Sequence, residues 1–311
     1  MVNSPITYSF VIPHHNTPDL LKRLIDSIPQ REDIEIIVVD DNSDADKKAS
    51  VKRPDVKTIY IDKEHTKGAG RARNIGMDAA IGKWLLFADA DDLYKPGFID
   101  VLDEYKDDDI EMLFFYVDYV DSDTLRPIPY DIRMKSSDVV RMYDGSQEST
   151  DILLYFGWTP WHKMQRRSFV KCYGFRFEEV PKGNDIFFSW QLGYFVKKFK
   201  VDSRVLYSVA FYKNSITFGS DNAYKYKYTM ANFRKRFKFF QFIGHPEWNK
   251  KSIRGKYKQS VFLYIVRALK RRPVIGLKAL CYYFSHFIYI EKSSSYYVKV
   301  IKEMEKFKCD N

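Results

Sequence analysis

Short apolar runs that resemble buried β-strands alternate with helical segments over about the first 120 residues of this 311-residue chain, and this alternation constrains its fold most strongly. The strand-like runs cover residues 8–12, 34–39, 57–61, 84–88 and 112–116. Helices are expected at residues 18–28, from their apolar spacing, at 69–81, and at 96–105, where Pro96 can open a helix. Such alternation predicts an α/β fold in which a mostly parallel sheet carries helices on both faces. Apolar residues make up 45% of the chain, enough for a sizeable core.

Two of these runs end in clusters of carboxylates. Asp89, Asp91 and Asp92 follow the fourth run, and Asp40 and Asp41 follow the second. In parallel sheets ligands bind beyond the carboxyl ends of the strands, so we expect both clusters at one edge. Grouped carboxylates repel one another unless a cation neutralises them, and their oxygens suit Mg²⁺ or Mn²⁺, which also bind phosphate. The sequence predicts a metal-dependent site for a phosphorylated ligand; for one cluster alone, a solvated acidic turn is the alternative.

The positive charge of the chain is concentrated near its C-terminus. From Lys213 onward the sequence has 22 Lys or Arg and 6 Asp or Glu, whereas the preceding part has 29 and 35. We interpret this tail as a basic, mainly helical region with an amphipathic stripe between Leu277 and Ile288. Such a stripe either packs on the protein or lies on an anionic membrane surface, and basic faces also attract the phosphates of nucleic acid or substrate.

The three cysteines, Cys172, Cys281 and Cys309, are far apart and show neither a CxxC pair nor zinc-ligand spacing. An odd number of cysteines without such a framework predicts reduced thiols in a cytoplasmic setting. The first residues lack a signal-peptide pattern, and no run of about 18 apolar residues predicts a membrane-spanning helix. We therefore expect a cytoplasmic protein, and peripheral contact with the inner face of the cell membrane stays open.

The first hundred residues contain four ordered motifs: FVIPHHN at 10–16, IVVDDNS at 37–43, GRARNIG at 70–76 and FADADD at 87–92. Their order and spacing resemble the family-2 glycosyltransferases with the GT-A fold, and a looser resemblance continues to about Thr217. The resemblance implies a nucleotide-diphospho-sugar transferase domain with a Rossmann-like sheet over residues 1–218. It implies a nucleotide-binding half at about 1–118 and an acceptor half at about 119–218, followed by the basic helical region at 219–311.

The resemblance also implies roles for residues near the strand ends. Those expected to bind the nucleotide sugar are Pro13, Asn16, Asp40, Asp41, Arg73, Asn74, Asp89 and Asp91. Among them, Asp41 would accept a hydrogen bond from the base, with Asp40 supporting it, and Asp89 would approach the ribose. Asp91, together with Asp89, would hold the Mn²⁺ or Mg²⁺ that bridges the diphosphate. The role of Asp92 stays open.

A second group of residues is expected on the acceptor side. By the family pattern, Asp185 is the base that deprotonates the acceptor hydroxyl, and Asn184 stands where a Glu is common, a departure expected to reshape acceptor recognition. In a Trp-x-Lys element, Trp161 would stack on a sugar face and Lys163 would meet a phosphate or hydroxyl. Two alternatives stay open: Asp185 as a helix N-cap, and Trp161 as a buried structural residue.

These features predict an inverting, metal-dependent glycosyltransferase in capsule, exopolysaccharide or lipopolysaccharide synthesis. The predicted donor is a nucleotide-diphosphate sugar, with UDP as the expected nucleotide, and the predicted acceptor is a glycan or a lipid-linked glycan. Processive family members carry a Gln-x-x-Arg-Trp motif and spanning helices; the sequence has neither, so one sugar per encounter is expected. The alternatives are a nucleotidyltransferase-like enzyme and a non-catalytic module that binds nucleic acid through the tail. The leading interpretation has no nucleic-acid partner, and the sequence does not indicate an oligomeric state.

Overall fold

The computed structural model describes residues 5–66, 68–128, 139–180, 183–211, 239–245, 277 and 298–307. The chain divides into two compact units, Met1–Gly219 and Ser220–Asn311. In the second unit the described residues include helical segments at 239–242 and 298–304. Of the amphipathic stripe predicted in the tail, the structure describes Leu277, whose side chain is exposed; the rest lies outside the described residues.

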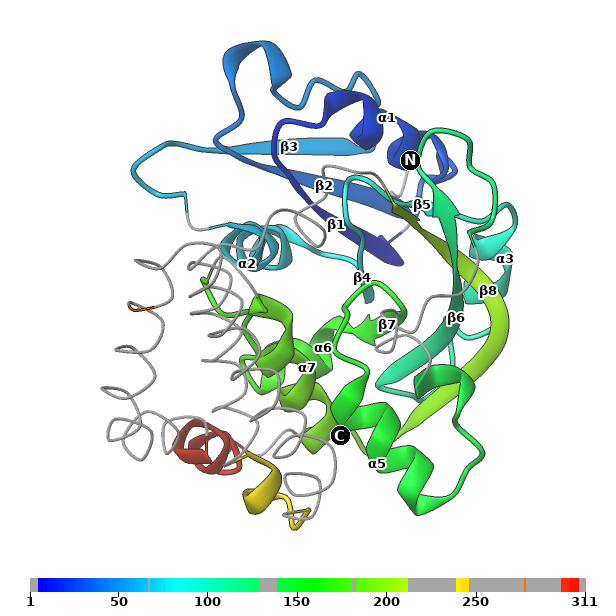
Figure 1. The fold of residues 1–311 in the computed structure, drawn as a ribbon, viewed down its shortest axis with the longest axis vertical. Helices are drawn as coiled ribbons and strands as arrows, with labels where there is room; N and C mark the ends of the chain where they lie inside the picture. Colours follow the sequence, from blue (N-terminus) through cyan, green and yellow to red (C-terminus); the bar gives the residue numbers. More distant parts are fainter. Residues whose placement is uncertain are drawn as a thin grey trace. The chain divides into compact units, whose positions relative to one another are not determined.

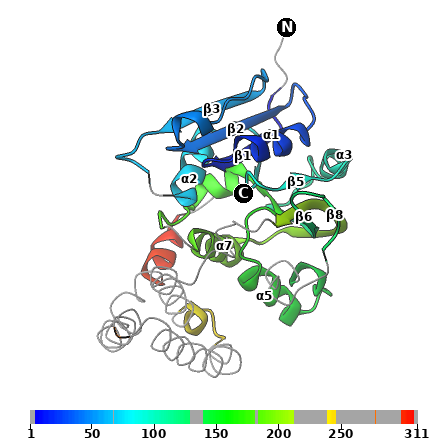
Figure 2. The same ribbon diagram turned by 45° about the horizontal axis from the view of Figure 1, so that its top comes forward.

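An eight-stranded sheet forms the centre of the first unit (Figures 1 and 2). Its strands are β1 (Tyr8–His14), β2 (Ile34–Asp41), β3 (Val56–Ile61), β4 (Trp84–Phe87), β5 (Leu93–Tyr94), β6 (Met112–Asp121), β7 (Lys163–Arg166) and β8 (Phe199–Phe211). They lie in the order β3-β2-β1-β4-β7-β6-β8-β5. The first four pair in parallel, whereas β7 runs antiparallel to both β4 and β6, and β8 pairs parallel with β6 and antiparallel with β5. The predicted α/β class is confirmed, with a parallel first half and a mixed second half.

The helices of this unit pack on the sheet and on one another. They are α1 (Pro18–Asp26), α2 (Ala69–Ala79), α3 (Phe98–Asp103), α5 (Gln147–Phe156), α6 (Arg167–Cys172) and α7 (Asn184–Phe195), with a 3₁₀ helix at Ala45–Lys47. All three predicted helices form. The third, α3, does not open at Pro96 as expected but begins after Gly97, which has a left-handed φ of 76°, and it ends two residues before the predicted end.

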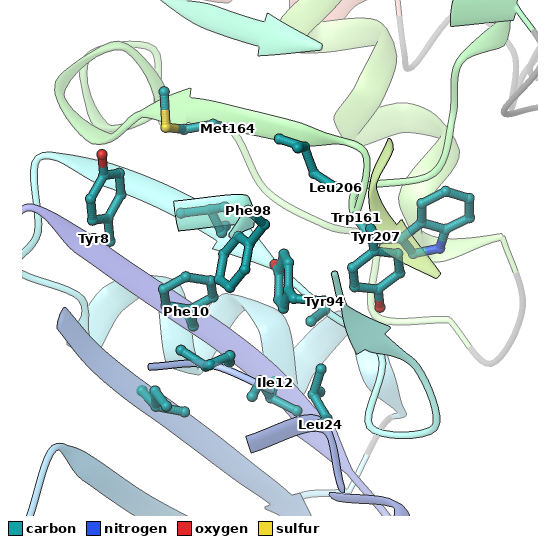
Figure 3. Packing of buried hydrophobic residues seen from close by; sticks show 14 of the residues in the cluster. Tyr8, Phe10, Ile12, Leu24, Tyr94, Phe98, Trp161, Met164, Leu206 and Tyr207 are labelled. Atoms are coloured by element: carbon teal, nitrogen blue, oxygen red, sulfur yellow. The ribbon is translucent and has the colours of Figure 1, made fainter. Parts of the chain in front are cut away.

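Alternate residues of β1 face opposite sides of the sheet, because side chains alternate along a strand. Tyr8, Phe10 and Ile12 belong to the core that α1 and α3 cover (Figure 3). Phe10 packs edge-on against Tyr94 and Phe98, with ring centroids 5.3 and 6.0 Å away. Since burying one such side chain contributes about 1.5–3 kcal/mol, this cluster holds the strands that carry the acidic motifs in a fixed arrangement.

On the opposite face, α2 and α7 lie close to the sheet. A Cβ atom on Gly76 of α2 would lie 2.4 Å from Cγ1 of Val11, so the helix can approach β1 this closely because the residue is a glycine. Phe87 of β4 packs against Phe177 and Phe188, at centroid distances of 5.0 and 5.7 Å. The last glycine of the GRARNIG motif therefore serves packing, and it holds the helix that carries two predicted site residues.

Cys172, the last residue of α6, is disulfide-bonded, so the prediction that the cysteines are reduced is wrong for this residue. A disulfide here removes one argument for a cytoplasmic location, because disulfides are rare in that compartment. Among the described residues, no helix has the length and apolar character needed to cross a membrane. The stretch that carries the family resemblance to Thr217 ends beyond β8, outside the described residues.

Candidate active site

The carboxyl ends of three neighbouring strands bring the two acidic clusters to one edge of the sheet. β1 lies between β2 and β4 and is parallel to both, so all three strands end on the same side. Asp40 and Asp41 are the last residues of β2, and Asp89 and Asp91 follow β4. Pro13, half-buried near the end of β1, belongs to the strand between them. Of the predicted nucleotide and metal residues, this edge holds Pro13, Asp40, Asp41, Asp89 and Asp91.

Asp40 is an internal anchor of this edge. Its carboxylate accepts hydrogen bonds from the N–H groups of Ser43 (2.8 Å) and Ala49 (2.7 Å) and from Nδ1 of His14 (3.1 Å). The Nε2 atom of His14 accepts from the N–H of Thr17, which assigns the proton to Nδ1. Burial alone would raise the pKa of Asp40, but these hydrogen bonds bring it below its usual range. Asp40 therefore fixes the turn after β2, and its predicted support of base recognition by Asp41 stays a prediction.

Asp41, the predicted ligand of the base, is also engaged by the protein. Its carboxylate oxygens accept hydrogen bonds from Oγ1 of Thr66 (2.7 Å) and from the N–H of Gly68 (2.8 Å). These contacts join the end of β2 to the start of α2. A carboxylate has about four lone-pair sites, so it can accept further hydrogen bonds. Base recognition by Asp41 stays a prediction.

Two sharp turns follow the strand ends. Asn16 after β1 and Asn42 after β2 have left-handed φ angles of 58° and 59°, a conformation that Asn tolerates better than most residues. The side-chain amide of Asn16 donates to Asp44 at 3.1 Å, and its side-chain oxygen accepts from the N–H of Asp44 at 2.8 Å. Asn16 thus connects the two turns, and its predicted contact with the nucleotide stays a prediction.

Asp92, whose role the sequence left open, fixes the turn that carries the other acidic residues. The hydroxyl of Tyr207 on β8 donates to Asp92 at 2.7 Å, and the N–H of Ala210 donates to it at 2.8 Å. The same hydroxyl accepts from the N–H of Asp89 at 3.0 Å. Burial, with the charges of Asp91 and Asp89, raises the pKa of Asp92 well above its usual value. Asp92 is therefore structural: it attaches the turn to β8.

The charge of the Asp91 carboxylate is only partly compensated. Burial, reinforced by the charge of Asp89, raises the pKa of Asp91 to about 6, and the charges of Arg23 and Arg73 oppose this rise. Arg23, on α1, donates from Nη2 to the main-chain carbonyl of Asp91 and from Nη1 to the carbonyl of Ser122 at 2.6 Å. The arginine therefore holds the backbone of the turn while the Asp91 carboxylate lacks a side-chain partner among the described residues.

The residues at this turn fit a divalent cation that is shared with a ligand. Among the described residues, no group of three or more His, Cys, Asp or Glu side chains forms a complete metal site. Asp89 and Asp91 supply oxygen donors, and Mg²⁺ is commonly bound by one or two carboxylates together with water and substrate phosphates. The raised pKa of Asp91 also indicates negative charge that a cation would stabilise.

Arg73 links this edge of the sheet to α7. Its guanidinium donates from Nη2 to Asp89 and from Nη1 to Oδ1 of Asn184 at 2.7 Å. Its Cζ atom lies 5.4 Å from the ring centroid of Phe177. Asn184 is neutral, so the charge of this buried arginine is directed at Asp89 and, through space, at Asp185. The Asn184 side chain is thus engaged by Arg73, and its predicted part in acceptor recognition stays a prediction.

Asn74, the next residue on α2, uses its side chain differently. Its amide donates to the carbonyl of Phe177 at 3.0 Å and its oxygen accepts from the N–H of Phe177 at 2.9 Å. Both contacts hold the segment before α7 against α2. This pair of hydrogen bonds gives Asn74 a structural task, and its predicted proximity to the nucleotide stays a prediction.

Asp185 lies in the first turn of α7, where the helix dipole favours a negative charge. Gly183, with a left-handed φ of 70°, is the N-cap, so the alternative that Asp185 caps the helix is wrong. Burial raises the pKa of Asp185, whereas Arg73 and Lys163 attract its charge and Asp89 repels it. A carboxylate with a raised pKa beside the acidic edge has the properties expected of a base.

The Trp-x-Lys element is buried. The Trp161 side chain is 7% exposed and its ring stacks on Tyr207 at 5.6 Å and 12° between the planes. Figure 3 shows these two residues at one end of the core cluster. Lys163 is 2% exposed and donates to the carbonyl of Gly157 and to Oγ of Ser189. In this structure both side chains contact protein, and their binding of an acceptor stays a prediction.

Arg23 and Tyr207 support the site but carry no sequence signal for it. In the sequence Arg23 has the pattern of an ordinary residue of an amphipathic helix. It lies 68 residues before Asp91, whose main-chain carbonyl it contacts. Tyr207 lies 115 residues after Asp92, among many other aromatic residues. The positions of predicted strand ends in the sequence do not identify such partners, because these contacts depend on how β8 and α1 pack.

Comparison with known proteins identifies the family. The model for glycosyl transferase family 2 matches residues 9–174, more than half of the chain. EpsH of Bacillus subtilis (strain 168), named as a putative glycosyltransferase, is 24% identical over 221 residues, covering 67% of this chain and 62% of that protein. The GalNAc(5)-diNAcBac-PP-undecaprenol beta-1,3-glucosyltransferase of Campylobacter jejuni is 34% identical over 100 residues, covering 30% of this chain and 32% of that enzyme. The chain thus spans less than two thirds of both relatives.

The fold is also similar to that of a solved structure. Residues 1–349 of S. aureus TarS in complex with UDP-GlcNAc match with a TM-score of 0.52 and 17% identity, covering 72% of this chain and 64% of that one. At this level of identity the likeness supports the fold alone. Because the family model matches the strands and turns that build the acidic edge, this chain belongs to glycosyl transferase family 2.

Proposed function

We propose that this protein is an inverting, metal-dependent glycosyltransferase that adds one sugar per encounter. The donor is a nucleotide-diphosphate sugar, with UDP as the nucleotide, and the acceptor is a glycan. Membership of glycosyl transferase family 2 supports the reaction class. TarS, which shares the fold, was crystallised in complex with UDP-GlcNAc, and this supports the choice of UDP by analogy of fold.

The observation that carries this proposal is the position of Arg73 between Asp89 and Asn184. One buried guanidinium contacts the acidic edge, where a donor phosphate and metal would bind. It also contacts Asn184, the first residue of the helix that carries the predicted base. Asp89, a predicted metal ligand, and Asp185, the predicted base, therefore belong to one site in which the charge of each affects the other. Transfer requires such proximity, because the acceptor oxygen must attack the sugar carbon opposite the leaving diphosphate.

In the proposed reaction Asp185 accepts the proton of the acceptor hydroxyl while that oxygen forms a bond to the anomeric carbon. The bond from this carbon to the diphosphate oxygen breaks, and its electron pair leaves with the nucleotide diphosphate. A single displacement inverts the anomeric centre. The raised pKa of Asp185, caused by burial, makes the carboxylate a stronger base than an exposed aspartate.

A divalent cation, Mn²⁺ or Mg²⁺, would stabilise the negative charge that develops on the leaving diphosphate. Asp91 and Asp89 would hold it. Arg73 keeps Asp89 oriented, and Arg23 fixes the backbone of Asp91, so both carboxylates are positioned before the ligand arrives. This arrangement reduces the reorganisation needed on binding.

The acceptor belongs, in this proposal, to surface-polysaccharide synthesis, with a lipid-linked glycan as the favoured form. The Campylobacter relative is named for an undecaprenol-linked substrate, and a further relative is the succinoglycan biosynthesis protein ExoO of Rhizobium meliloti. A cytoplasmic location at the inner membrane face, with the basic region at 219–311 contacting anionic lipid, fits such an acceptor. Capsule, exopolysaccharide and lipopolysaccharide pathways share this chemistry.

Donor binding and transfer test the proposal directly. A thermal-shift panel of nucleotide sugars with Mn²⁺ or EDTA should show stabilisation by one donor in the presence of metal. With that donor and a lipid-linked acceptor, Asp185→Asn should lower kcat by about 10²–10⁴. Asp107→Asn changes an exposed aspartate elsewhere and should leave the rate unchanged. The proposal would be refuted if Asp185→Asn hydrolysed the donor or transferred its sugar at the wild-type rate. It would also be refuted if no nucleotide sugar of the panel bound the protein.

A further inference from the structure

The ammonium group of Lys163 is buried beside the predicted base. Lys163 begins β7, and its Nζ donates to the carbonyl oxygen of Gly157 and, at 3.2 Å, to Oγ of Ser189 on α7. Oγ of Ser189 in turn donates to the carbonyl oxygen of Trp158 at 2.6 Å. One lysine therefore joins α7 to the segment that precedes β7.

The charge of Lys163 lies on the face of α7 that carries the base. Asp185 and Ser189 are four residues apart in this helix, so their side chains share one face. Since Lys163 contacts Ser189, its ammonium lies near Asp185, and each charge favours the charged form of the other. Among the described residues no hydrogen bond joins Lys163 to a carboxylate, so its direct partners are neutral oxygens.

A buried lysine with neutral partners is costly to the fold. Burial lowers the pKa of Lys163 to about 7, and the charge of Asp185 opposes this fall. If the side chain served only to fill the core, an apolar residue of similar volume would stabilise the fold more. If it served only as a hydrogen-bond donor, a neutral amide would suffice. A role that requires the positive charge explains the choice of lysine.

Lys163 acts on Asp185 together with charged groups from other elements. From α2, Arg73 favours the Asp185 carboxylate, and from the turn after β4, Asp89 disfavours it. The neighbouring His162 is buried, and burial together with the Lys163 charge holds the pKa of His162 well below its usual value, so this imidazole is neutral. Its Nδ1 contacts the hydroxyl of Thr159 at 2.6 Å, which keeps the ring within the core.

We propose that Lys163 is a positioning residue for the base: its ammonium keeps Asp185 ionised and holds the Asp185 face of α7 against the segment before β7. This inference rests on the proposed function. It replaces the expectation that Lys163 binds a phosphate or hydroxyl of the acceptor. The lysine acts on the reaction through Asp185 and does not touch the substrate.

The test separates the charge of Lys163 from its hydrogen bonds. Lys163→Met removes both, Lys163→Gln keeps a donor without the charge, and Ser189→Ala removes one acceptor while keeping the charge. Lys198→Met, which alters an exposed lysine paired with Asp109, is the matched control. For each purified full-length variant, kcat/KM for sugar transfer is measured between about pH 5 and pH 9, with thermal unfolding alongside.

In the wild-type protein kcat/KM should rise with pH as Asp185 loses its proton, and this rise is the acidic limb of the pH profile. We expect the limb to move to higher pH by about one unit in both Lys163 variants, because an opposite charge lowers a carboxyl pKa by about 1–3 units. At pH values below the limb the rate should fall about tenfold, and at high pH it should approach the wild-type rate. Ser189→Ala should lower the unfolding temperature without moving the limb. The control should change neither quantity.

An acidic limb that stays in place in both Lys163 variants overturns the inference, and a rise of KM for the acceptor with an unchanged limb would assign Lys163 to acceptor binding instead. Should both variants fail to fold, the carboxyl ¹³C signal of Asp185 in the wild-type protein decides, with Asp185→Asn assigning the signal. It must show a second inflection as Lys163 loses its proton; a single inflection overturns the inference. If the wild-type protein transfers no sugar, the proposed function itself is refuted. If Asp185→Asn is inactive but the acidic limb of the two Lys163 variants does not move, only the role of Lys163 is refuted.

Discussion

Asp91→Asn should make the metal-free protein more stable while removing its metal-dependent activity. A rise of the Asp91 pKa from 3.8 to about 6 corresponds to about 3 kcal/mol of destabilisation at pH 7. Solvent around this half-buried group reduces the effect to about 1–2 kcal/mol. Asn has nearly the same shape and no charge, so the substitution removes this penalty.

The sign of the pH dependence follows from proton binding. The folded chain holds the Asp91 proton more tightly than the unfolded chain, so the Asp91 contribution to stability falls as pH rises from about 4 to about 6 and stays low above this window. The advantage of Asp91→Asn should therefore be full at pH 7 and shrink toward about pH 4. Chemical denaturation of both proteins in EDTA at several pH values measures it directly.

Added Mn²⁺ and donor provide the second half of the test. They should raise the unfolding temperature of the wild-type protein and leave that of Asp91→Asn nearly unchanged, because the variant has lost a charged ligand. Asp107→Asn, at an exposed site, should behave as wild type in both measurements. An Asp91→Asn protein that is less stable than wild type in EDTA at pH 7, or that Mn²⁺ stabilises as strongly as wild type, would refute the reasoning.

Two further predictions concern the residues that hold the acidic turn. Arg23→Met removes the hydrogen bonds to the carbonyls of Asp91 and Ser122 and should weaken Mn²⁺ binding about 10- to 100-fold, read from the metal dependence of transfer; unchanged metal dependence would contradict it. Tyr207→Phe leaves the buried carboxyl of Asp92 with one partner fewer and should lower the free energy of unfolding by about 1–3 kcal/mol, measured by denaturant titration. A cost within error of zero would show that this hydroxyl does not anchor the turn.

The strands of the first half of the sheet were predictable because their sequences leave little alternative. β2 is a run of β-branched residues with buried side chains along nearly its whole length. β7 could not be found in this way. Its sequence, KMQR, resembles an exposed turn, yet it is a central strand in which Lys163 and Gln165 are buried. Such a strand is fixed by its neighbours β4 and β6, and its own composition gives no signal.

The positions of the acidic residues in the sequence, directly after predicted parallel strands, were enough to predict the acidic edge of the sheet. A residue that follows a parallel strand lies at the carboxyl end of the sheet wherever the rest of the chain goes, so Asp41 and Asp91 were placed by position alone. Tertiary structure decided which groups surround them. The contact of Arg73 with Asn184 spans 111 residues, and that of Lys163 with Ser189 depends on how α7 packs against β7. Charge coupling acts through space, and the chain order does not encode spatial distance between elements, so these partners emerged only from the folded chain.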